Sequence, residues 1–199
     1  MKSFLRRALV LFFVVAVLAA VTWLAMPALR SPIEMIRLAW MPVPEALPVP
    51  VDGVERRQIA DTWGGPRRGG RKHEGVDIFA PRGTPVRSTT RGVVLRVGEN
   101  RLGGLHASVL GPGLQVHYYA HFDRFGDFDG GDVVASGDVL GYVGDTGNAR
   151  GTPPHLHYGI YTPSDGAVNP WPLLSDEVNA TRPAPIGLPA RPVARASPS

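Results

Sequence analysis

The chain contains no cysteine, so the sequence excludes both a disulfide framework and a zinc site built from thiolates. It has no Gly-X-Y repeat, and a collagen-like structure is therefore excluded in spite of its 24 glycines and 20 prolines. Between residues 58 and 173, no stretch of helical length carries a sustained apolar stripe with a period of about 3.6 residues. The absence of helical stripes favours a domain built mainly from β-strands. The length of 199 residues favours one compact domain.

The charge balance is basic, with a formal net charge of +4 at pH 7. A basic chain favours anionic surroundings such as lipid headgroups, cell-wall polymers or nucleic acid, and charge alone does not choose among them. No nucleic-acid-binding motif accompanies the charge, so we expect no nucleic-acid partner. The basic side chains indicate either ordinary solubility or attraction to a carboxylate-rich wall polymer. Many are arginines in the first half of the expected domain, at positions 67, 68, 71, 82, 87, 91, 96 and 101.

The N-terminus carries the basic residues Lys2, Arg6 and Arg7, and residues 8–29 then form an apolar run without a charge. At about 1.5 Å per residue, a helix over this run reaches about 33 Å, enough to cross a hydrocarbon core of about 30 Å. A cleaved signal peptide is the alternative, but its apolar core is usually shorter, about 7 to 15 residues. We therefore expect residues 1–29 to be a cytoplasmic basic start and an uncleaved, single-pass transmembrane helix. The charge distribution places the rest of the chain on the outer side of the cytoplasmic membrane, periplasmic or extracellular.

Residues 30–57 are expected to connect this anchor to the folded domain as a juxtamembrane helix and a Pro-rich spacer. The stretch SPIEMIRLAW predicts a short helix with Ser31 as its N-cap and Glu34 completing a capping box. This helix either lies on the membrane surface, with Trp40 at the interface, or is a simple linker turn. Prolines follow at positions 42, 44, 48 and 50, and they favour an extended, semi-rigid spacer.

The folded domain is expected at residues 58–173, because residues 174–199 are rich in Pro, Ala and Arg and favour a disordered tail. Inside the domain, short β-like stretches such as GVDIFA, RGVVLRVG, LQVHYYAHF and HLHYGIY are separated by Gly, Pro, Asn or Asp. This pattern predicts a single, mainly antiparallel β domain.

Two stretches of the domain each supply a weak functional signal. In HEGVD, His73 and Asp77 have a spacing that would share one face of a helix, but the surrounding glycines predict a loop that runs into a strand. In YYAHFD, an alternating strand would place His117, Tyr119 and His121 on one face. A surface histidine or a hydrogen-bonded pair is the commoner explanation of either stretch taken alone.

A third stretch, HLHYGI, places His155 and His157 on the same face of a strand. Two imidazoles held side by side favour a metal-binding or catalytic role. Hydrolytic zinc sites commonly take three ligands from His and Asp or Glu and keep the fourth position for water, whose pKa falls to about 7. His73, Asp77 and one histidine of this pair would complete such a set. The remaining histidines of these stretches would serve in proton transfer and in stabilising the developing oxyanion.

Taken together, these stretches resemble the lysostaphin/LytM-type zinc metallopeptidases, peptidase family M23. HEGVD matches the H-x-x-x-D motif of that family, YAHFD its Tyr-x-His segment and HLH its H-x-H motif, in the expected order over roughly residues 60–172. The resemblance implies that His73, Asp77 and His157 bind one zinc ion per chain and that His121 and His155 act in catalysis. It also implies an antiparallel, β-rich groove. The implied activity is endopeptidase hydrolysis of peptidoglycan stem-peptide cross-links, with a zinc-bound water as nucleophile.

The sequence departs from the family pattern at two places and leaves an alternative function open. Gly159 stands where family members often carry an acidic residue, and the loop GNARGTPP is longer than the commoner form. The alternative is a non-catalytic LytM-like regulator that binds the wall or activates another hydrolase, and a scaffold with a structural zinc is a third reading. Regulators of this kind lack part of the metal-binding set, whereas this chain keeps every position. The two remaining histidines, His106 and His117, are most simply surface or strand residues.

Overall fold

The computed structural model describes residues 12–15, 17 and 30–176. Most of the predicted transmembrane segment at residues 8–29, and residues 177–199 of the predicted tail, therefore lie outside the described residues. Within the described part of the chain, no helix has the length and apolarity needed to cross a bilayer.

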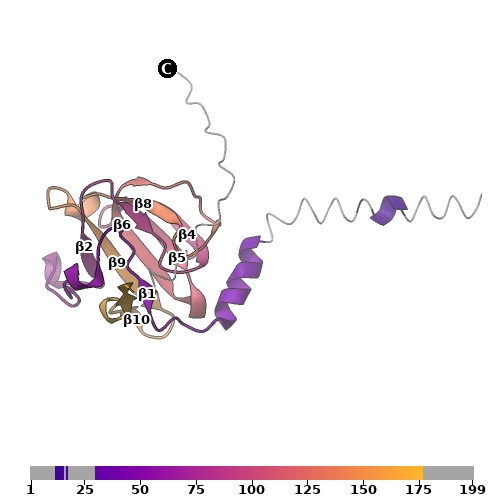
Figure 1. Cartoon of the computed structure of the whole chain (residues 1–199), viewed down its shortest axis with the longest axis horizontal. Helices are drawn as coiled ribbons and strands as arrows, with labels where there is room; N and C mark the ends of the chain where they lie inside the picture. The colour runs from indigo at the N-terminus through magenta and orange to yellow at the C-terminus, as the bar shows by residue number, and fades with distance from the viewer. Residues whose placement is uncertain (1–11, 16, 18–29, 177–199) are drawn as a thin grey trace, which may run out of the picture.

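Most strands of the described residues form one large antiparallel sheet, as the sequence predicted (Figure 1). The path of hydrogen-bonded neighbours is β10-β9-β6-β5-β4-β7, and β2 pairs with β9 while β8 pairs with β3 and β6. The strands of this sheet are β2 Val76–Phe79, β3 Pro85–Arg87, β4 Gly92–Asn100, β5 Gly104–Leu110, β6 Val116–Phe125, β7 Val133–Val134, β8 Val139–Val143, β9 His155–Thr162 and β10 Gly166–Val168. Short 3-10 helices lie between them: η1 Arg56–Gln58, η2 Arg68–Gly70, η3 Pro112–Leu114, η4 Gly147–Ala149 and η5 Trp171–Leu173.

The hydrophobic core lies along one face of the long central strands. In β9, Leu156, Tyr158 and Ile160 are fully buried, and they alternate with residues that point to the other face. Tyr119 and Phe122 of β6 join the same core. The strands therefore present a packed apolar face and, on their other side, a face available for functional side chains.

The folded unit begins before the predicted boundary at residue 58. Strand β1, Leu47–Pro48, pairs in parallel with β11, Leu174–Ser175, and Leu174 is itself buried. Val49 and Val51 are also buried in the core, so residues 47–51 form a strap across the domain instead of a free spacer. The prolines of this segment argue against a strand, because proline donates no ladder hydrogen bond. Proline is nevertheless tolerated at a sheet edge, where this segment lies.

Residues 30–40 are helical, close to the predicted helix. The side chains expected to form its capping box contact the sheet domain instead. The Ser31 hydroxyl donates to the Gly131 carbonyl, and the Glu34 carboxylate accepts from the Arg91 guanidinium, with Nη2 and Oε2 2.9 Å apart. The helix is therefore docked on the domain through polar contacts.

Candidate active site

Three side chains form a compact triangle of candidate metal ligands: His73, Asp77 and His157. The His73 Nε2 atom lies 2.9 Å from His157 Nδ1 and 3.0 Å from Asp77 Oδ1, and His157 Nδ1 lies 3.1 Å from the same oxygen. Ligand atoms at about 2.0 Å from a tetrahedral zinc ion are about 3.3 Å apart, so a small expansion of the triangle would fit the ion. Two imidazole nitrogens and one carboxylate oxygen are also a donor set typical of catalytic zinc. The fold thus brings together the three residues that the family resemblance implied as ligands.

The register of β2 and β9 sets this triangle. In that antiparallel pair Asp77 lies directly opposite His157. His73 precedes β2, and its Nδ1–H donates to the Thr62 carbonyl at 2.7 Å. Because a carbonyl oxygen only accepts, this bond leaves the lone pair on His73 Nε2, which faces the triangle. Gly75 gives the His157 ring its space, since a Cβ atom there would lie 2.6 Å from His157 Cε1.

The second carboxylate oxygen of Asp77 is held by an arginine that the sequence distinguished only as one of many basic residues. Arg67 Nη2 donates to Asp77 Oδ2 at 2.5 Å, and the Asp77 amide donates to Thr62 Oγ1 at 3.0 Å. Burial would raise the pKa of the Asp77 carboxyl, but the adjacent His157 and His73 rings hold this pKa well below its usual range. Burial lowers the pKa of His157. Both effects favour an ionised carboxylate and a neutral imidazole, the states that bind a metal.

Two further histidines lie beside the triangle. The His121 ring centroid is 5.0 Å from that of His155 and 5.9 Å from that of His157. His121 Nδ1–H donates to the Thr146 carbonyl at 2.9 Å, and His155 Nδ1–H donates to the Pro153 carbonyl at 2.8 Å. Both neutral rings therefore keep an unprotonated Nε2 that can accept a proton. Burial is the main cause that lowers the pKa of His121, to about 4.

His121 reaches the site through a break in the strand pattern. The predicted common face for His117, Tyr119 and His121 is wrong, because His117 and Tyr119 are fully buried while the His121 ring lies beside those of His155 and His157. In the ladder between β5 and β6, Tyr119 pairs with Ala107 and Phe122 pairs with Leu105, so β6 has one extra residue between these two pairs. His121 lies in this bulge and has a φ of +67°. An extra residue in one strand turns the following side chains to the opposite face. A positive φ is uncommon outside glycine, and residues with strained backbones cluster at functional sites.

Strand β9, by contrast, keeps the alternation that the sequence predicted. Leu156 and Tyr158 are fully buried in the core. His155 and His157 project from the other face, and both rings lie near that of His121. The expectation that these two histidines share one face is confirmed.

The two remaining histidines lie in strands, as expected, but neither is on the surface. His106 in β5 is buried, and its Nδ1–H donates to the Gly104 carbonyl at 3.0 Å. His117 in β6 is fully buried, with Nδ1 2.8 Å from the Tyr158 hydroxyl and 3.2 Å from Thr89 Oγ1. Burial lowers the pKa of His117 to about 4. Neither ring belongs to the triangle of candidate ligands.

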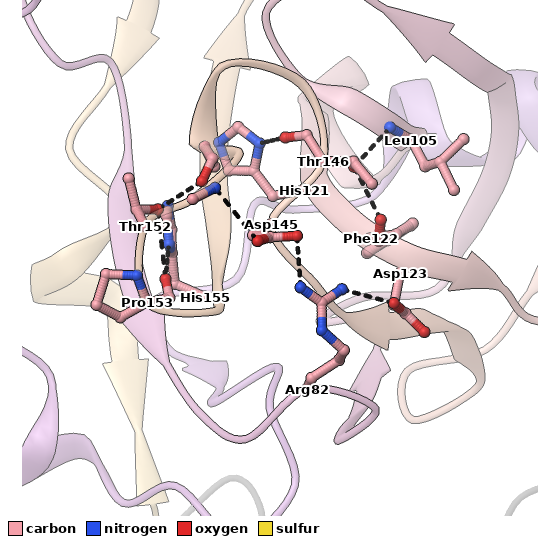
Figure 2. Close-up of polar contacts among 12 residues, drawn as sticks. Arg82, Leu105, His121, Phe122, Asp123, Asp145, Thr146, Thr152, Pro153 and His155 are labelled. Atoms are coloured by element: carbon pink, nitrogen blue, oxygen red, sulfur yellow. Dashed lines mark hydrogen bonds and ion pairs between the residues drawn. The ribbon is translucent and has the colours of Figure 1, made fainter.

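One loop supplies both backbone acceptors of His121 and His155 (Figure 2). It comprises residues 144–154, which connect β8 to β9 and include the stretch GNARGTPP. The start of the loop is tied to two other segments by Arg82. Arg82 Nη2 donates to Asp145 Oδ1 at 2.6 Å, and Arg82 Nη1 donates to Asp123 Oδ1 at 2.7 Å. Nothing in the local sequence around Arg82 indicated this contact, because its partners lie far along the chain.

A cleft of about 270 Å³ opens beside His73. Its lining includes Trp63, Lys72, Glu74 and Asp165, so it offers one aromatic surface and charges of both signs. The cleft borders the candidate site at His73 alone, and the other four candidate site residues are not part of its lining.

The departure from the family pattern at Gly159 has a steric explanation. A Cβ atom at this position would lie 2.9 Å from the Glu74 carbonyl oxygen. The backbone next to His73 therefore occupies the space that a side chain at position 159 would need.

The fold and the site together define a class of protein: an antiparallel β domain with one candidate metal centre flanked by two histidines. The chain belongs to peptidase family M23, whose sequence model matches residues 71–170. This range contains all five candidate site residues, His73, Asp77, His121, His155 and His157. The family resemblance found in the sequence is thereby confirmed.

Relatives share the matched region, over part of their length. The L-Ala–D-Glu endopeptidase of Bacillus subtilis is 42% identical over 124 residues, which cover 57% of this chain and 38% of that protein. The peptidoglycan DD-endopeptidase ShyC of Vibrio cholerae is 34% identical over 86 residues, covering 43% of this chain and 19% of that protein. The solved catalytic domain of the antimicrobial peptidase lysostaphin from Staphylococcus simulans has 30% identity and a TM-score of 0.52, covering 57% of this chain and 89% of that domain. This chain therefore spans less than half the length of these two curated relatives.

Proposed function

We propose that this chain is a zinc metalloendopeptidase that hydrolyses peptide cross-links of peptidoglycan. The observation that carries the proposal is the triangle of His73, Asp77 and His157 beside two rings that keep Nε2 unprotonated. The substrate class comes from the relatives, one named an L-Ala–D-Glu endopeptidase and another a peptidoglycan DD-endopeptidase. Peptidoglycan stem peptides are accordingly the proposed substrate.

The ligand triangle would hold one zinc ion per chain through His73 Nε2, Asp77 Oδ1 and His157 Nδ1. When bound, zinc supplies the Lewis acidity that activates the attacking water and polarises the scissile carbonyl. Arg67 holds Asp77 Oδ2 by a hydrogen bond, so that Oδ1 stays directed at the two histidines. Ligand orientation by such outer contacts is a general feature of metal sites.

His121 and His155 are the proposed catalytic residues. In the tautomer shown, Nε2 of either ring can accept the proton of the attacking water. Once protonated, a ring can donate a hydrogen bond to the developing oxyanion or a proton to the leaving amine. Because both rings have the same tautomer and both donate Nδ1–H to a backbone carbonyl, the two roles can fall on either residue.

Digestion of purified peptidoglycan of known cross-link type, with mass analysis of the fragments, tests this proposal. We expect the zinc-loaded full chain to release fragments cut at one type of stem-peptide bond, and we expect no release after chelation. Zinc-bound protein that leaves the polymer intact would favour the alternative, a non-catalytic regulator that binds the wall.

The proposal also places the enzyme at the outer face of the cytoplasmic membrane, anchored by residues 8–29. The helix at residues 30–40 follows this apolar run directly, and it supports the placement. Its Leu38 is fully buried, whereas Ile33, Ile36 and Trp40 are 56%, 65% and 87% exposed. Positions three and four apart share one helix face, so these three side chains form an apolar stripe suited to a bilayer surface.

The docking of this helix would orient the active site. Its partners Arg91 and Gly131 lie just before β4 and β7, at one end of the strand order. The metal triangle lies on β2 and β9, toward the other end (Figure 1). A helix lying on the bilayer would therefore turn the site away from the lipid and toward the wall.

The absence of cysteine makes this placement testable in the full chain. A probe on Trp40→Cys should be quenched by a lipid-soluble agent in proteoliposomes, whereas a probe on the control Leu102→Cys, in the β4–β5 turn, should not. The protein should also keep its N-terminus and stay with membranes after a high-salt wash, because apolar insertion is not screened by ions. A soluble protein whose N-terminus begins near residue 21 or 29 would contradict the anchor.

A further inference from the structure

We propose that Arg82 is a positioning residue for catalysis: it clamps the loop at residues 144–154, whose carbonyls hold His121 and His155 in the tautomer that presents Nε2. The inference rests on the proposed catalytic roles of these two histidines. It adds a residue that touches neither the substrate nor the candidate metal ligands.

The two acceptors of the catalytic pair belong to one structural unit. Thr146 and Pro153 lie near the two ends of the loop, and each offers its carbonyl to one ring. A neutral imidazole carries its proton on either nitrogen, and the hydrogen bond made by one nitrogen decides which. A shift of this loop would therefore release both rings together.

Arg82 fixes the loop where it leaves the sheet. Its guanidinium bridges Asp145, which directly precedes Thr146, and Asp123, which lies two residues after His121 in β6. One planar side chain thus ties the strand that carries His121 to the loop that carries its acceptor (Figure 2). The five donors of a guanidinium in fixed geometry suit this bridging of two carboxylates, and a lysine ammonium would not reproduce it.

Further hydrogen bonds of Asp145 and Thr146 hold the loop in place. The remaining Asp145 oxygen, Oδ2, accepts from the Gly151 amide at 3.4 Å, near the Pro153 end. Thr146 Oγ1 donates to the Phe122 carbonyl at 2.8 Å, next to His121. Asp145 therefore connects the arginine bridge to both acceptors: Thr146 is its neighbour in the chain, and Gly151 lies two residues before Pro153.

The arginine bridge is partly exposed, with 47% of the Arg82 side chain accessible. Exposed ion pairs contribute little to folding stability, so removing Arg82 should leave the fold intact. The chain offers a matched control in Arg87, which binds Asp52 through two hydrogen bonds of 2.6 and 2.7 Å. That pair joins β3 to the segment after the strap and contacts neither histidine of the pair nor the loop.

The test compares Arg82→Ala with Arg87→Ala in the zinc-loaded full chain. We expect Arg82→Ala to lower kcat about 10- to 100-fold with KM and zinc content nearly unchanged, because misplacement of a catalytic group by about 1 Å has effects of this size. Arg82→Lys should recover only part of this loss, and Arg87→Ala should keep kcat within a factor of about two. An Arg82→Ala protein with the wild-type kcat, or with a loss matched by Arg87→Ala, would overturn the proposal.

A second readout does not depend on activity. Nitrogen NMR of labelled histidines distinguishes protonated from unprotonated ring nitrogens, and it should show Nδ1–H for His121 and His155 in the wild type. Arg82→Ala should give a mixture of tautomers at both rings, whereas Arg87→Ala should not. Unchanged tautomers in Arg82→Ala would refute the clamp even if kcat falls in this variant. Altered tautomers in a chain that cuts no peptidoglycan would support the clamp and reject the endopeptidase function.

Discussion

The metal triangle and the catalytic pair lie side by side, but the chain positions them by different means. The triangle depends on the register between β2 and β9, which sets Asp77 opposite His157, and on side-chain partners such as Arg67. The pair His121 and His155 depends on carbonyls of a single loop. Metal binding and turnover should therefore respond to different substitutions.

The largest effect should follow the loss of a ligand. Asp77→Ala leaves only two imidazoles for the ion, so we expect zinc to be lost on dialysis and hydrolysis to become undetectable. Metal analysis and peptidoglycan digestion on the same samples measure both. Asp52→Ala removes an aspartate from the Arg87 pair and serves as the control, with zinc retained. Zinc at the wild-type level in Asp77→Ala would remove this residue from the triangle.

The second-largest effect should separate turnover from zinc binding. His121→Ala leaves all three ligands in place, so zinc should stay near one per chain while kcat falls about 10²- to 10⁴-fold, as for the loss of a general acid-base group. His106→Ala, which changes a buried histidine outside the site, should keep kcat if the protein folds. Loss of zinc from His121→Ala would mean that the two regions are not separable.

His117 belongs to neither region and sets a baseline for pH dependence. Its pKa falls from 6.5 in the unfolded chain to about 4 in the fold because of burial. The unfolded chain then binds more protons between these values, so stability is full above about pH 6.5 and declines as the pH falls toward 4. The titration of His117 should lower the free energy of unfolding by about 3 kcal/mol over this pH range.

Chemical unfolding of the wild type and of His117→Gln between pH 4 and pH 7 measures this contribution. Since His121 titrates in the same range and is present in both proteins, its effect cancels in the difference. The difference in unfolding free energy should change with pH by about 3 kcal/mol. Parallel pH curves for the two proteins would show that His117 does not carry the dependence.

The smallest effect should come from the contact behind the triangle. Arg67→Ala should weaken zinc affinity about 10- to 100-fold, the usual cost of losing an outer contact to a ligand. At saturating zinc, kcat should change little, because His121 and His155 keep their acceptors. Arg101→Ala is the control for a general loss of positive charge. Competition with a chelator of known affinity gives the values, and an unchanged zinc affinity would exclude a role for Arg67 at the metal.

Local patterns predicted the residues that regular strands and short motifs place. His155 and His157 share a face because β9 keeps a period of two, and His73 and Asp77 were identified from one short stretch. The face of His121 was mispredicted because a bulge with a positive φ at a histidine has no local sequence signal.

Local sequence patterns did not predict the long-range contacts. The sequence predicts only solubility or attraction to a wall polymer for Arg67 and Arg82, since their carboxylate partners are identified only once the strands pair. The prolines of residues 47–51 predict a spacer, whereas the alternating apolar side chains of this strap are buried in the core. These are the features that tertiary structure, and not local preference, decides.

The central claim is that one histidine of the HLH stretch binds metal while its neighbour two residues away serves catalysis. Zinc content after dialysis, measured side by side in His155→Ala and His157→Ala, tests it most directly. We predict about one zinc per chain in His155→Ala, with turnover reduced, and little zinc in His157→Ala. Zinc lost from His155→Ala but kept in His157→Ala would contradict the account.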